Sequence, residues 1–267
     1  MEIREKAVAA RVESVKVSIV TAVRNNVVTI EDAILSVASQ SYNNIEHIIV
    51  DGASTDGTID VIENYQGKST KVISEPDRGI YDAMNKGLRL VSGDVIGFLN
   101  ADDMYTDDTV IEDVIHTMSV QQVDAVFGDL VIVARDNLKR VVRYYESKSF
   151  NADMVAKGCM PAHPTLFFRK KVFEKYGYFK IDYAIAADFE FVARVFGKGE
   201  ISYYYIPKVM VKMRKGGVST KNLKSNWILN KEILRACREN GIKTNLFNIL
   251  SKYPKKILGL IKSNKIL

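Results

Sequence analysis

Two adjacent carboxylates follow a run of apolar residues in the stretch FLNADD, which covers residues 98–103. Asp102 and Asp103 repel each other at this position, and a bound divalent cation would remove the repulsion. Carboxylate oxygens are the hard ligands that Mg²⁺ or Mn²⁺ prefers, and such ions often bridge a protein carboxylate and a substrate phosphate. Asn100 can add a carbonyl oxygen. The alternative is an acidic turn in which Asp103 or Asp107 caps the next helix.

A third acid that could do chemistry is Asp188, in the stretch IAADFEF. Small apolar residues before it and a phenylalanine after it would partly remove water from its carboxylate. Such burial raises the pKa of a carboxyl group towards that of a useful general base. Because Asp is also favoured at the start of a helix, Asp188 can serve as a helix cap as well. Glu190 is the nearby competitor for the role of base, or for a contact with a ligand.

The turn-rich stretch DGASTDGT, residues 51–58, is not a dinucleotide-binding fingerprint, and the sequence has no phosphate-loop lysine. Dinucleotide binding and ATP hydrolysis therefore lose support. Asp51 follows an apolar run and could accept a hydrogen bond from a base N–H. Arg78 stands just before a predicted helix, where its guanidinium could reach a base or a phosphate. A surface ion pair with Asp77 or Asp82 is the alternative for Arg78.

A histidine and two glycines complete the set of candidates. His163 lies between Pro161 and Pro164 in a constrained loop, so it could face a ligand or a metal. Gly216 and Gly217 follow the basic stretch KMRK at 212–215, and glycines beside cations can close over a diphosphate. A plain flexible loop is the alternative for the glycines.

The segments before these residues alternate between strand and helix patterns. Apolar runs predict strands at 15–23, 45–50, 71–74 and 94–99, and helical spacing predicts helices at 30–38, 58–65 and 80–91. Such alternation is typical of an α/β fold with a doubly wound, mostly parallel sheet. Ligands of these sheets bind beyond the carboxyl ends of the strands. We therefore expect one polar edge that carries Thr21, Arg24, Asn25, Asp51, Asp56, residues 75–78 and residues 100–103.

The second half of the chain has a more mixed pattern. A helix is predicted up to about residue 120, followed by two antiparallel strands at 125–133 and 139–145. Further along we expect a strand at 165–168, a helix around 189–196 and a pair of short strands within 201–213. The halves look too interdependent for two separate domains, so we predict one domain over residues 1–220.

Residues 221–267 are predicted to form a basic, amphipathic helical extension. This segment holds nine Lys and two Arg against two Glu, a net charge of +9, whereas the whole chain of 267 residues has +6. Apolar residues from Leu246 to Ile261 recur at roughly helical spacing between lysines, which favours an anionic membrane surface as a partner. A helix packed on the body with a solvated lysine face is the alternative. Nucleic acid is not expected as a partner.

Composition excludes several other classes of protein. No apolar run is long enough for a transmembrane helix, and the N-terminus has no apolar signal-peptide core. Cys159 and Cys237 lack metal-like spacing and are expected to be reduced, buried thiols. We therefore expect a cytoplasmic protein, with the cytoplasmic face of a membrane as its site of action.

Five stretches together resemble the family-2 glycosyltransferases with the GT-A fold. They are VSIVTAVRN, QSYNNIEHIIVDGASTDGT, EPDRGIYDAMNKG, GDVIGFLNADD and IAADFEF, within residues 15–220. The resemblance implies inverting transfer of a sugar from a nucleoside-diphosphate donor. It also implies that Asp188 is the catalytic base and that Asp102 and Asp103 hold Mn²⁺ or Mg²⁺, with Asp103 as the more direct ligand. The implied nucleotide site comprises Thr21, Ala22, Arg24, Asn25, Asp51, Arg78, Asn85 and Asp102.

The sequence departs from the common family pattern in places. Asn100 stands where many relatives have Asp, and the QxxRW motif of the processive members is absent. A single transfer is therefore expected rather than polymer synthesis. The EPDRGIYDAMNKG and HPT stretches resemble bacterial enzymes of surface-polysaccharide synthesis, which implies a glycan or lipid-linked acceptor. Base recognition by Asp51 and Arg78 slightly favours a UDP-sugar.

Two other functions remain open at this point. A sugar-nucleotide pyrophosphorylase also uses acids and Mg²⁺ in an α/β fold, but it usually has a glycine-rich loop where this chain has TAVRNN. A non-catalytic nucleotide-sugar-binding protein would not need the acid at Asp188.

Overall fold

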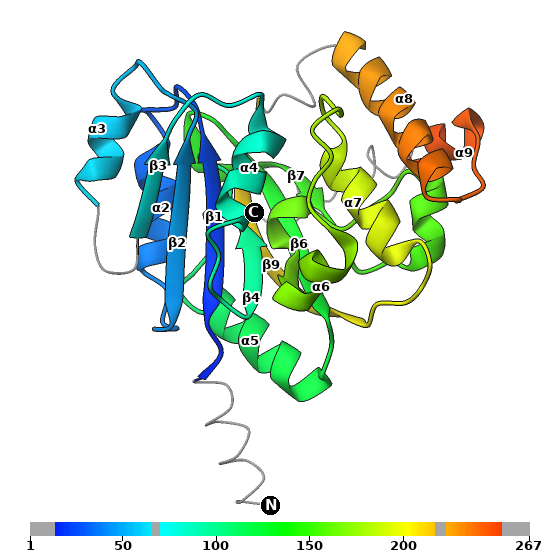
Figure 1. Ribbon diagram of the computed structural model, residues 1–267, viewed down its shortest axis with the longest axis horizontal. Helices are drawn as coiled ribbons and strands as arrows, with labels where there is room; N and C mark the ends of the chain where they lie inside the picture. The colour runs from blue at the N-terminus through cyan, green and yellow to red at the C-terminus, as the bar shows by residue number, and fades with distance from the viewer. Residues whose placement is uncertain (1–13, 66–69, 217–222, 253–267) are drawn as a thin grey trace, which may run out of the picture.

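Four parallel strands form one half of a single sheet (Figure 1). The computed structural model describes residues 14–65, 70–216 and 223–252. The four strands follow one another in the order β3-β2-β1-β4. They are β1 (Val17–Val23), β2 (Ile45–Asp51), β3 (Thr70–Ser74) and β4 (Val95–Phe98). This arrangement confirms the predicted parallel half of the sheet.

The other half of the sheet has mixed strand directions. β8 (Phe167–Arg169) pairs antiparallel with β4, and β6 (Ala125–Ala134) pairs antiparallel with β8. β9 (Tyr203–Arg214) runs parallel to β6. β7 (Asn137–Tyr145) forms the predicted hairpin with β6.

Residues 203–214 correct one prediction, because they form a single strand and not two short ones. Pro207 lies in this strand at a point where the pairing with β6 shifts. Phe127 pairs with Tyr205, and Asp129 pairs with Val209. Such an irregularity accommodates a residue that has no N–H to donate, so the strand continues past the proline.

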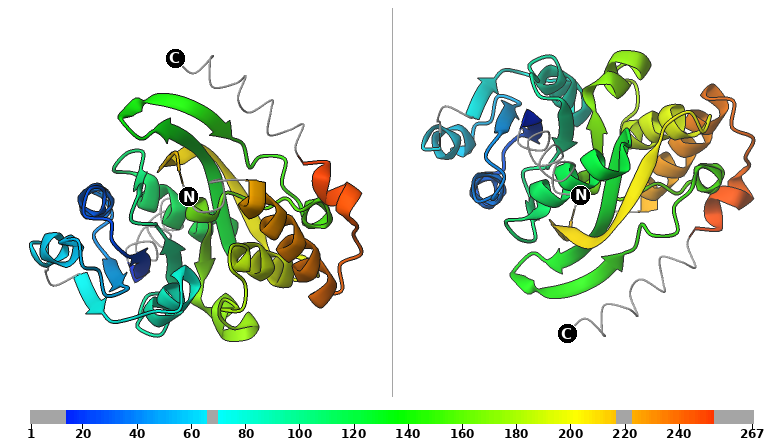
Figure 2. Two further views of the ribbon diagram at one scale, coloured as in Figure 1. Left: turned by 90° about the horizontal axis from the view of Figure 1, so that it is seen from above. Right: turned by 90° about the horizontal axis from the view of Figure 1, so that it is seen from below.

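A short strand that the sequence does not reveal is β5 (Asp103–Tyr105), which pairs antiparallel with β9. Three residues are too few to show an alternating pattern. β5 follows β4 after a short turn, yet β8, β6 and β9 lie between the two strands in the hydrogen-bonded order. The sheet must therefore curl, and Figure 2 shows its green and yellow strands turned away from the blue and cyan ones.

Helices cover both faces of the sheet. The α-helices are α2 (Ile30–Ala38), α3 (Thr58–Glu63), α4 (Ile80–Leu88), α5 (Val110–Gln121), α6 (Lys170–Tyr176), α7 (Ala187–Phe196), α8 (Leu223–Glu239) and α9 (Leu246–Leu250). Two 3-10 segments, η1 (Ala152–Lys157) and η2 (His163–Thr165), precede β8. Figure 1 shows α4, α6 and α7 in front of the sheet and α2 behind it.

The central strand β1 is buried along its whole length, and its side chains alternate between two cores. Val20 and Ala22 pack with side chains of α4, α6 and α7. Val17 and Ile19 pack with side chains of α2 and α5 on the other face. Each face of the parallel half is therefore covered, so ligands can approach only at the strand ends.

The predicted boundary after residue 220 does not coincide with a break in the core. Ile233, Ala236 and Cys237 of α8 are buried in the same core as α7. Burial raises the pKa of the Cys237 thiol to about 11. Both cysteines are free, as predicted, although Cys159 is only partly buried. The residues of the predicted tail from 253 to 267 lie outside the described part of the chain.

Candidate active site

The first three strands end level with one another, which brings their polar residues to one edge. Val23 pairs with Asp51, and Asp51 pairs with Ser74. Asp51 is completely buried. Its Oδ2 accepts hydrogen bonds from the Ser54 amide at 3.0 Å and from the Ser74 hydroxyl at 2.6 Å, and the Ser54 hydroxyl donates to Oδ1. The carboxylate predicted to contact a base thus also shapes its own loop.

The loop after β1 is tied to the loop after β2. The amide of Asn25 donates to Ser54 Oγ at 2.7 Å, and Asn25 Oδ1 accepts from the amide of Thr55 at 2.9 Å. Thr21 is buried and shares a hydrogen bond of 2.9 Å with Nε2 of His47. Ala22 is buried as well, whereas Arg24 is exposed. The structure therefore brings the predicted nucleotide residues of these two loops together.

The structure indicates why residue 52 is a glycine, which the sequence alone does not show. A Cβ at this position would lie 2.0 Å from Oδ2 of Asp77 and 3.3 Å from Cδ of Arg24. The Asp77 carboxylate in turn accepts a hydrogen bond of 2.8 Å from the Gly79 amide. A side chain at residue 52 would therefore push the Asp77 carboxylate away from its present position beside the Asp51 loop.

Two predicted nucleotide residues near α4 differ in their surroundings. The side chain of Arg78 is 74% exposed and lies 3.6 Å from the carboxylate of Asp82. Asn85 is buried, and its side-chain amide donates to the Phe179 carbonyl at 2.8 Å and accepts from the Phe179 amide at 3.0 Å. Asn85 therefore anchors the segment after α6, while Arg78 stays accessible to a ligand.

The acidic turn after β4 places the carboxylates of Asp102 and Asp103 close together. Asp103 is completely buried, and its Oδ2 accepts a hydrogen bond of 3.0 Å from Asn100. Burial, and next the charge of Asp102, raise the pKa of Asp103 well above its ordinary value. Burial also raises the pKa of Asp102. The repulsion expected from the sequence is therefore present.

A basic side chain that the sequence analysis did not single out braces this turn. Arg214, the last residue of β9, is buried and donates from Nη1 to the Asp102 carbonyl at 3.2 Å. Its Nη2 pairs with Asp32 at the start of α2. The basic stretch 212–215 was the available signal. Gly216 has a φ of +121° and lies beside Arg135, whereas Gly217 lies outside the described residues.

The acidic turn fits a divalent cation. Oδ1 of Asn100 and Oδ1 of Asp103 are buried and have no hydrogen-bond partner within the described part of the chain. Hard oxygens left in this way are suited to Mg²⁺ or Mn²⁺. The described residues contain no group of three or more His, Cys, Asp or Glu side chains that would complete a protein site. Substrate phosphate and water would therefore have to supply the remaining ligands, as is usual for Mg²⁺.

Asp188 lies in the first turn of α7, partly exposed, beside the phenol of Tyr81. Its Oδ1 accepts hydrogen bonds from the Tyr81 hydroxyl at 3.1 Å and from the Phe189 amide at 2.8 Å. Within the described residues, Oδ2 has no hydrogen-bond partner, so one carboxylate oxygen remains free to take a proton. Burial, and next the charge of Asp188, raise the pKa of Tyr81 well above its ordinary value. Tyr81 is thus a neutral donor.

His163 lies close to this carboxylate. Its ring stacks on Phe98 with 5.5 Å between centroids and meets Phe179 edge-on at 5.9 Å. Burial lowers the pKa of His163, and the charge of Asp188 acts in the opposite direction. His163 has one buried ring nitrogen, Nε2, without a partner among the described residues.

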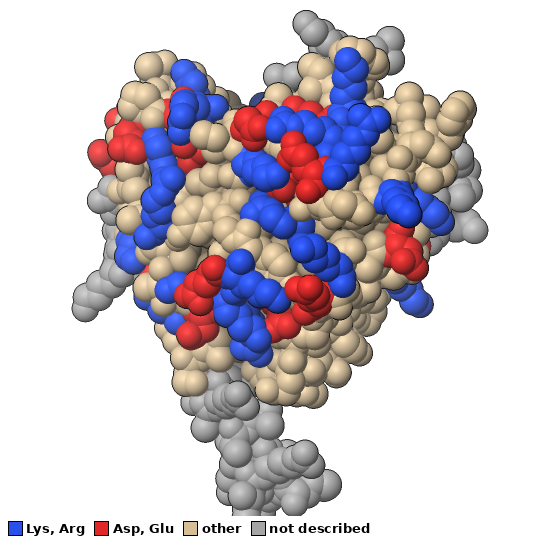
Figure 3. Space-filling model, turned by 45° about the vertical axis from the view of Figure 1, so that its right-hand side comes forward, with Lys and Arg blue, Asp and Glu red and all other residues tan. Residues whose placement is uncertain are grey.

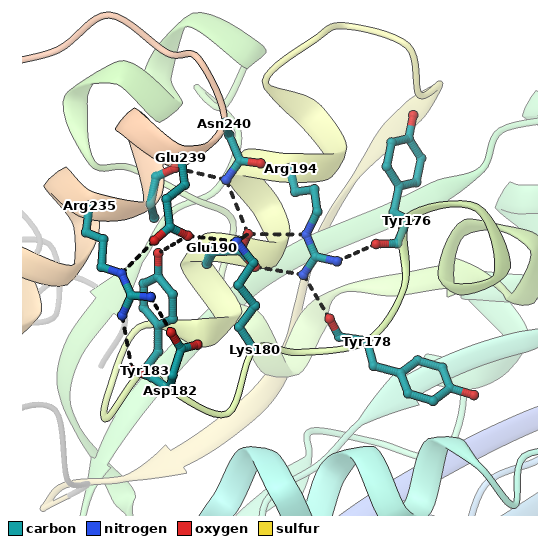
Figure 4. A network of polar contacts seen from close by, with 11 residues as sticks. Tyr176, Tyr178, Lys180, Asp182, Tyr183, Glu190, Arg194, Arg235, Glu239 and Asn240 are labelled. Atoms are coloured by element: carbon teal, nitrogen blue, oxygen red, sulfur yellow. Dashed lines mark hydrogen bonds and ion pairs between the residues drawn. The ribbon is translucent and has the colours of Figure 1, made fainter.

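Glu190 does not share the surroundings of Asp188. Residues two apart on an α-helix point to nearly opposite sides. The carboxylate of Glu190 is completely buried and binds the Arg194 guanidinium at 2.7 and 3.2 Å, Lys180 at 3.1 Å and Asn240 at 3.2 Å. Figure 4 shows these contacts between α7, α8 and the segment after α6. The geometry assigns Glu190 a structural role and does not support it as a competitor of Asp188.

A pocket opens beside Tyr81. It has a volume of about 240 Å³ and lies between the start of α4 and the segment 181–184. Arg78, Tyr81, Asp82 and Tyr183 are among its lining residues. Tyr81, within the EPDRGIYDAMNKG stretch, is a site residue that the sequence analysis did not name. The position of its motif beside Arg78 was the available signal.

Solved structures share the fold. TarS 1-349 of S. aureus in complex with UDP-GlcNAc matches with a TM-score of 0.67 and 17% identity, over 83% of this chain and 66% of that one. The mannosyltransferase PcManGT of Pyrobaculum calidifontis, in complex with GDP-Man and Mn²⁺, matches with a TM-score of 0.63 and 18% identity, over 94% and 73%. The predicted GT-A fold is therefore confirmed.

The sequence comparison defines the family. A family model described as glycosyl transferase family 2 matches residues 18–177, more than half of the chain. The protein therefore belongs to glycosyl transferase family 2.

Curated relatives agree with this family. A PGL/p-HBAD biosynthesis glycosyltransferase of Mycobacterium bovis (strain BCG / Pasteur 1173P2) is 29% identical over 75% of each chain. An uncharacterized glycosyltransferase of Mycobacterium tuberculosis (strain CDC 1551 / Oshkosh) is 31% identical over 67% of this chain and 68% of its own. None of the described helices has the length and apolar character needed to cross a bilayer.

Proposed function

We propose that this protein transfers a sugar, with inversion, from a nucleoside-diphosphate donor to a hydroxyl of a glycan or lipid-linked acceptor. The observation that carries the proposal is the strand edge with the Asp51 loop and the acidic turn at Asp102 and Asp103, together with the partly free carboxylate of Asp188 beside Tyr81. The family model and the fold support sugar transfer. A UDP-sugar is favoured, and a role in bacterial surface-polysaccharide synthesis follows from the sequence resemblance.

In the proposed mechanism, Asp188 is the general base. Its free Oδ2 accepts the proton of an acceptor hydroxyl, and the resulting oxygen attacks the anomeric carbon of the donor sugar. The bond from that carbon to the diphosphate oxygen breaks as the new bond forms, and the nucleoside diphosphate leaves with the electron pair. A single displacement inverts the anomeric centre. Tyr81 orients Asp188 through its hydroxyl.

The donor is proposed to lie along the strand ends. Arg78 is exposed beside the pocket at α4 and is available to a base or a phosphate. Asn100, Asp102 and Asp103 would hold Mn²⁺ or Mg²⁺, which would supply positive charge for the departing diphosphate. His163, with its unused Nε2, is proposed to contact the donor or the acceptor.

The protein is proposed to bind its acceptor at an anionic membrane surface, on the cytoplasmic face of the membrane. Two aromatic side chains near the C-terminus are exposed: Trp227 on α8 at 60% and Phe247 on α9 at 86%. Lys231 Nζ lies 3.4 Å from the ring centroid of Trp227, which combines a cation with an apolar surface. On the face shown in Figure 3, many of the described Lys and Arg side chains lie beside Asp and Glu.

The proposal is tested first by thermal stabilisation with a panel of nucleoside diphosphates, each with and without Mn²⁺. A ligand that binds only the folded protein raises its stability by RT ln(1 + [L]/Kd). A Mn²⁺-dependent shift with one nucleotide, followed by transfer from the matching nucleotide sugar to an acceptor, supports the proposal. The absence of a shift with every nucleotide contradicts it.

The same reactions separate the two alternative functions. A pyrophosphorylase would release sugar 1-phosphate when pyrophosphate is added to the nucleotide sugar. A non-catalytic binding protein would show the thermal shift without release of nucleoside diphosphate.

A further inference from the structure

The carboxylate of Glu232, on α8, binds three consecutive backbone amides just before Asp188. Oε1 accepts a hydrogen bond from the Ala184 amide at 2.7 Å. Oε2 accepts hydrogen bonds from the amides of Ile185 and Ala186, both at 2.9 Å. A carboxylate that accepts several backbone N–H bonds forms strong, charge-assisted contacts. This contact joins residues 46 to 48 positions apart in the chain.

These three amides precede a helix that lacks a cap of its own. Ala186 is the residue before α7, and no side-chain cap is present there. The first amides of a helix have no partner within the helix and need an acceptor from elsewhere. The negative charge of Glu232 also lies near the positive end of the α7 dipole, where it is stabilising. Of the three amides, only that of Ala186 belongs to the start of the helix, so Glu232 satisfies one of the first amides of α7 and otherwise holds the two residues before it.

Ile185 is held from both sides. Its N–H donates to Glu232, and its carbonyl oxygen accepts a hydrogen bond from the hydroxyl of Tyr81. The same hydroxyl lies 3.1 Å from Oδ1 of Asp188. The backbone that Glu232 binds at Ile185 is thus linked through the Tyr81 hydroxyl to the carboxylate of Asp188, which is proposed to accept the proton.

Helix α8 is itself held firmly enough to position this contact. Glu239 binds Lys180 Nζ at 2.7 Å and the Tyr183 hydroxyl at 3.0 Å (Figure 4). The hydrogen bond from Lys180 lowers the pKa of Glu239 to about 2, against the opposing effect of burial. One turn from Glu232, Cys237 and Ala236 are completely buried. The carboxylate of Glu232 therefore projects from a fixed support.

We propose that Glu232 is a positioning residue for Asp188, so that α8, which lies beyond the matched residues 18–177, is part of the active-site architecture. Glu232 fixes the 184–186 backbone and, through Tyr81, the direction of the Asp188 carboxylate. It touches neither the substrate nor the reacting atoms. This inference rests on the proposed function, in which Asp188 is the base.

Two variants of Glu232 and one neighbouring control test the proposal. Glu232→Ala removes all three hydrogen bonds, whereas Glu232→Gln can keep the two made to one oxygen. Ile233→Ala is the control. Ile233 is buried in the core between α8 and α7, so this variant should lower the stability of the protein without a change at the 184–186 amides. Turnover is measured well below the melting temperature of each variant, with saturating donor and acceptor.

Misplacement of a catalytic group by about 1 Å can cost on the order of 100-fold in rate, so Glu232→Ala should lower kcat about 10- to 100-fold. The KM for the donor should change less than about threefold, because the donor site at the strand ends is untouched. Glu232→Gln should fall between the wild type and Glu232→Ala, and Ile233→Ala should keep kcat within about twofold. Amide hydrogen exchange at 184–186 should accelerate in Glu232→Ala and stay unchanged at residues 45–51.

The wild-type reaction is read first. No turnover of any nucleotide sugar by the wild type would overturn the proposed function itself. Wild-type turnover together with an unchanged kcat in Glu232→Ala would overturn only the role of Glu232. Unchanged exchange at 184–186 in that variant would also overturn it, and this result does not depend on activity.

Discussion

The hydroxyl of Tyr81 lies 3.1 Å from Oδ1 of Asp188 and also donates to the carbonyl of Ile185. Tyr81 lies in the first turn of α4, while Asp188 lies in α7, more than a hundred residues further along the chain. The contact joins the motif that carries Arg78 to the acid proposed as the base. It therefore joins the proposed donor site to the proposed base.

We expect Asp188→Asn to remove transfer while donor binding persists. General base catalysis contributes about 100- to 10,000-fold, so kcat should fall within this range. The amide can still accept a hydrogen bond from the Tyr81 hydroxyl, so the fold around it should be kept. The measurement is nucleotide-sugar turnover beside nucleotide-dependent thermal stabilisation. Transfer at the wild-type rate in this variant would show that another group is the base.

Asp103→Asn should make the free protein more stable and the donor site weaker. The variant removes a buried charge that repels Asp102 and can keep the hydrogen bond with Asn100. A gain of about 1 kcal/mol corresponds to a rise in melting temperature of about 2–4 °C for a chain of this size. The Mn²⁺-dependent shift with nucleoside diphosphate should disappear.

Asp107→Asn is the matched control for this prediction, because Asp107 is exposed and pairs with Lys208 at 2.8 Å. It should leave the Mn²⁺-dependent shift unchanged. A full Mn²⁺-dependent shift in Asp103→Asn would remove Asp103 from the metal site.

Stability should fall as the pH drops from about 6.5 to about 4, because His47 is buried in its neutral form. Burial lowers the pKa of His47 from 6.5 to about 4. In this window the unfolded chain binds a proton that the folded chain does not, so unfolding becomes more favourable as the pH falls. The contribution of neutral His47 to the free energy of unfolding is present in full above pH 6.5. At 1.36 kcal/mol for each pKa unit, about 3 kcal/mol of it is lost by pH 4.

Urea unfolding at several pH values, compared between the wild type and His47→Gln, checks this prediction. The slope of unfolding free energy against pH between 4.5 and 6.5 should be smaller in the variant. His163, whose pKa is also lowered by burial, will leave a residual slope. Identical slopes for the two proteins would contradict the assignment to His47.

Glu190→Gln should destabilise the protein strongly. Glu190 is completely buried and forms ion pairs with Arg194 and Lys180. In the variant, these two cations would lose their buried negative partner. Breaking a buried ion pair by removal of one partner costs about 3–5 kcal/mol. Glu200→Gln is the control, because its pair with Lys175 is exposed and screened by solvent, so its unfolding free energy should stay near that of the wild type. A loss of stability no larger than that of the control would contradict the structural role of Glu190.

The sequence by itself determined the first half of the fold and the composition of the polar edge. The alternation of apolar runs with helical spacing depends on local periodicity, which can be read from neighbouring residues. Parallel strands then bring Asp51 and the turn that starts at Asn100 to one side, because the carboxyl ends of such strands share an edge. The small apolar residues before Asp188 made it a candidate base, and the family resemblance then implied that role.

Only the tertiary structure decided the contacts between distant elements. The strand β5, the continuous strand β9 and the packing of α8 on α7 depend on pairings that no local period reveals. The same holds for single residues. Asn85 holds the backbone of Phe179, Glu190 holds Arg194, and Glu232 holds the amides before α7. Their side chains are as polar as those of ligand-binding residues, so their roles depend on which partners the fold brings within hydrogen-bond distance.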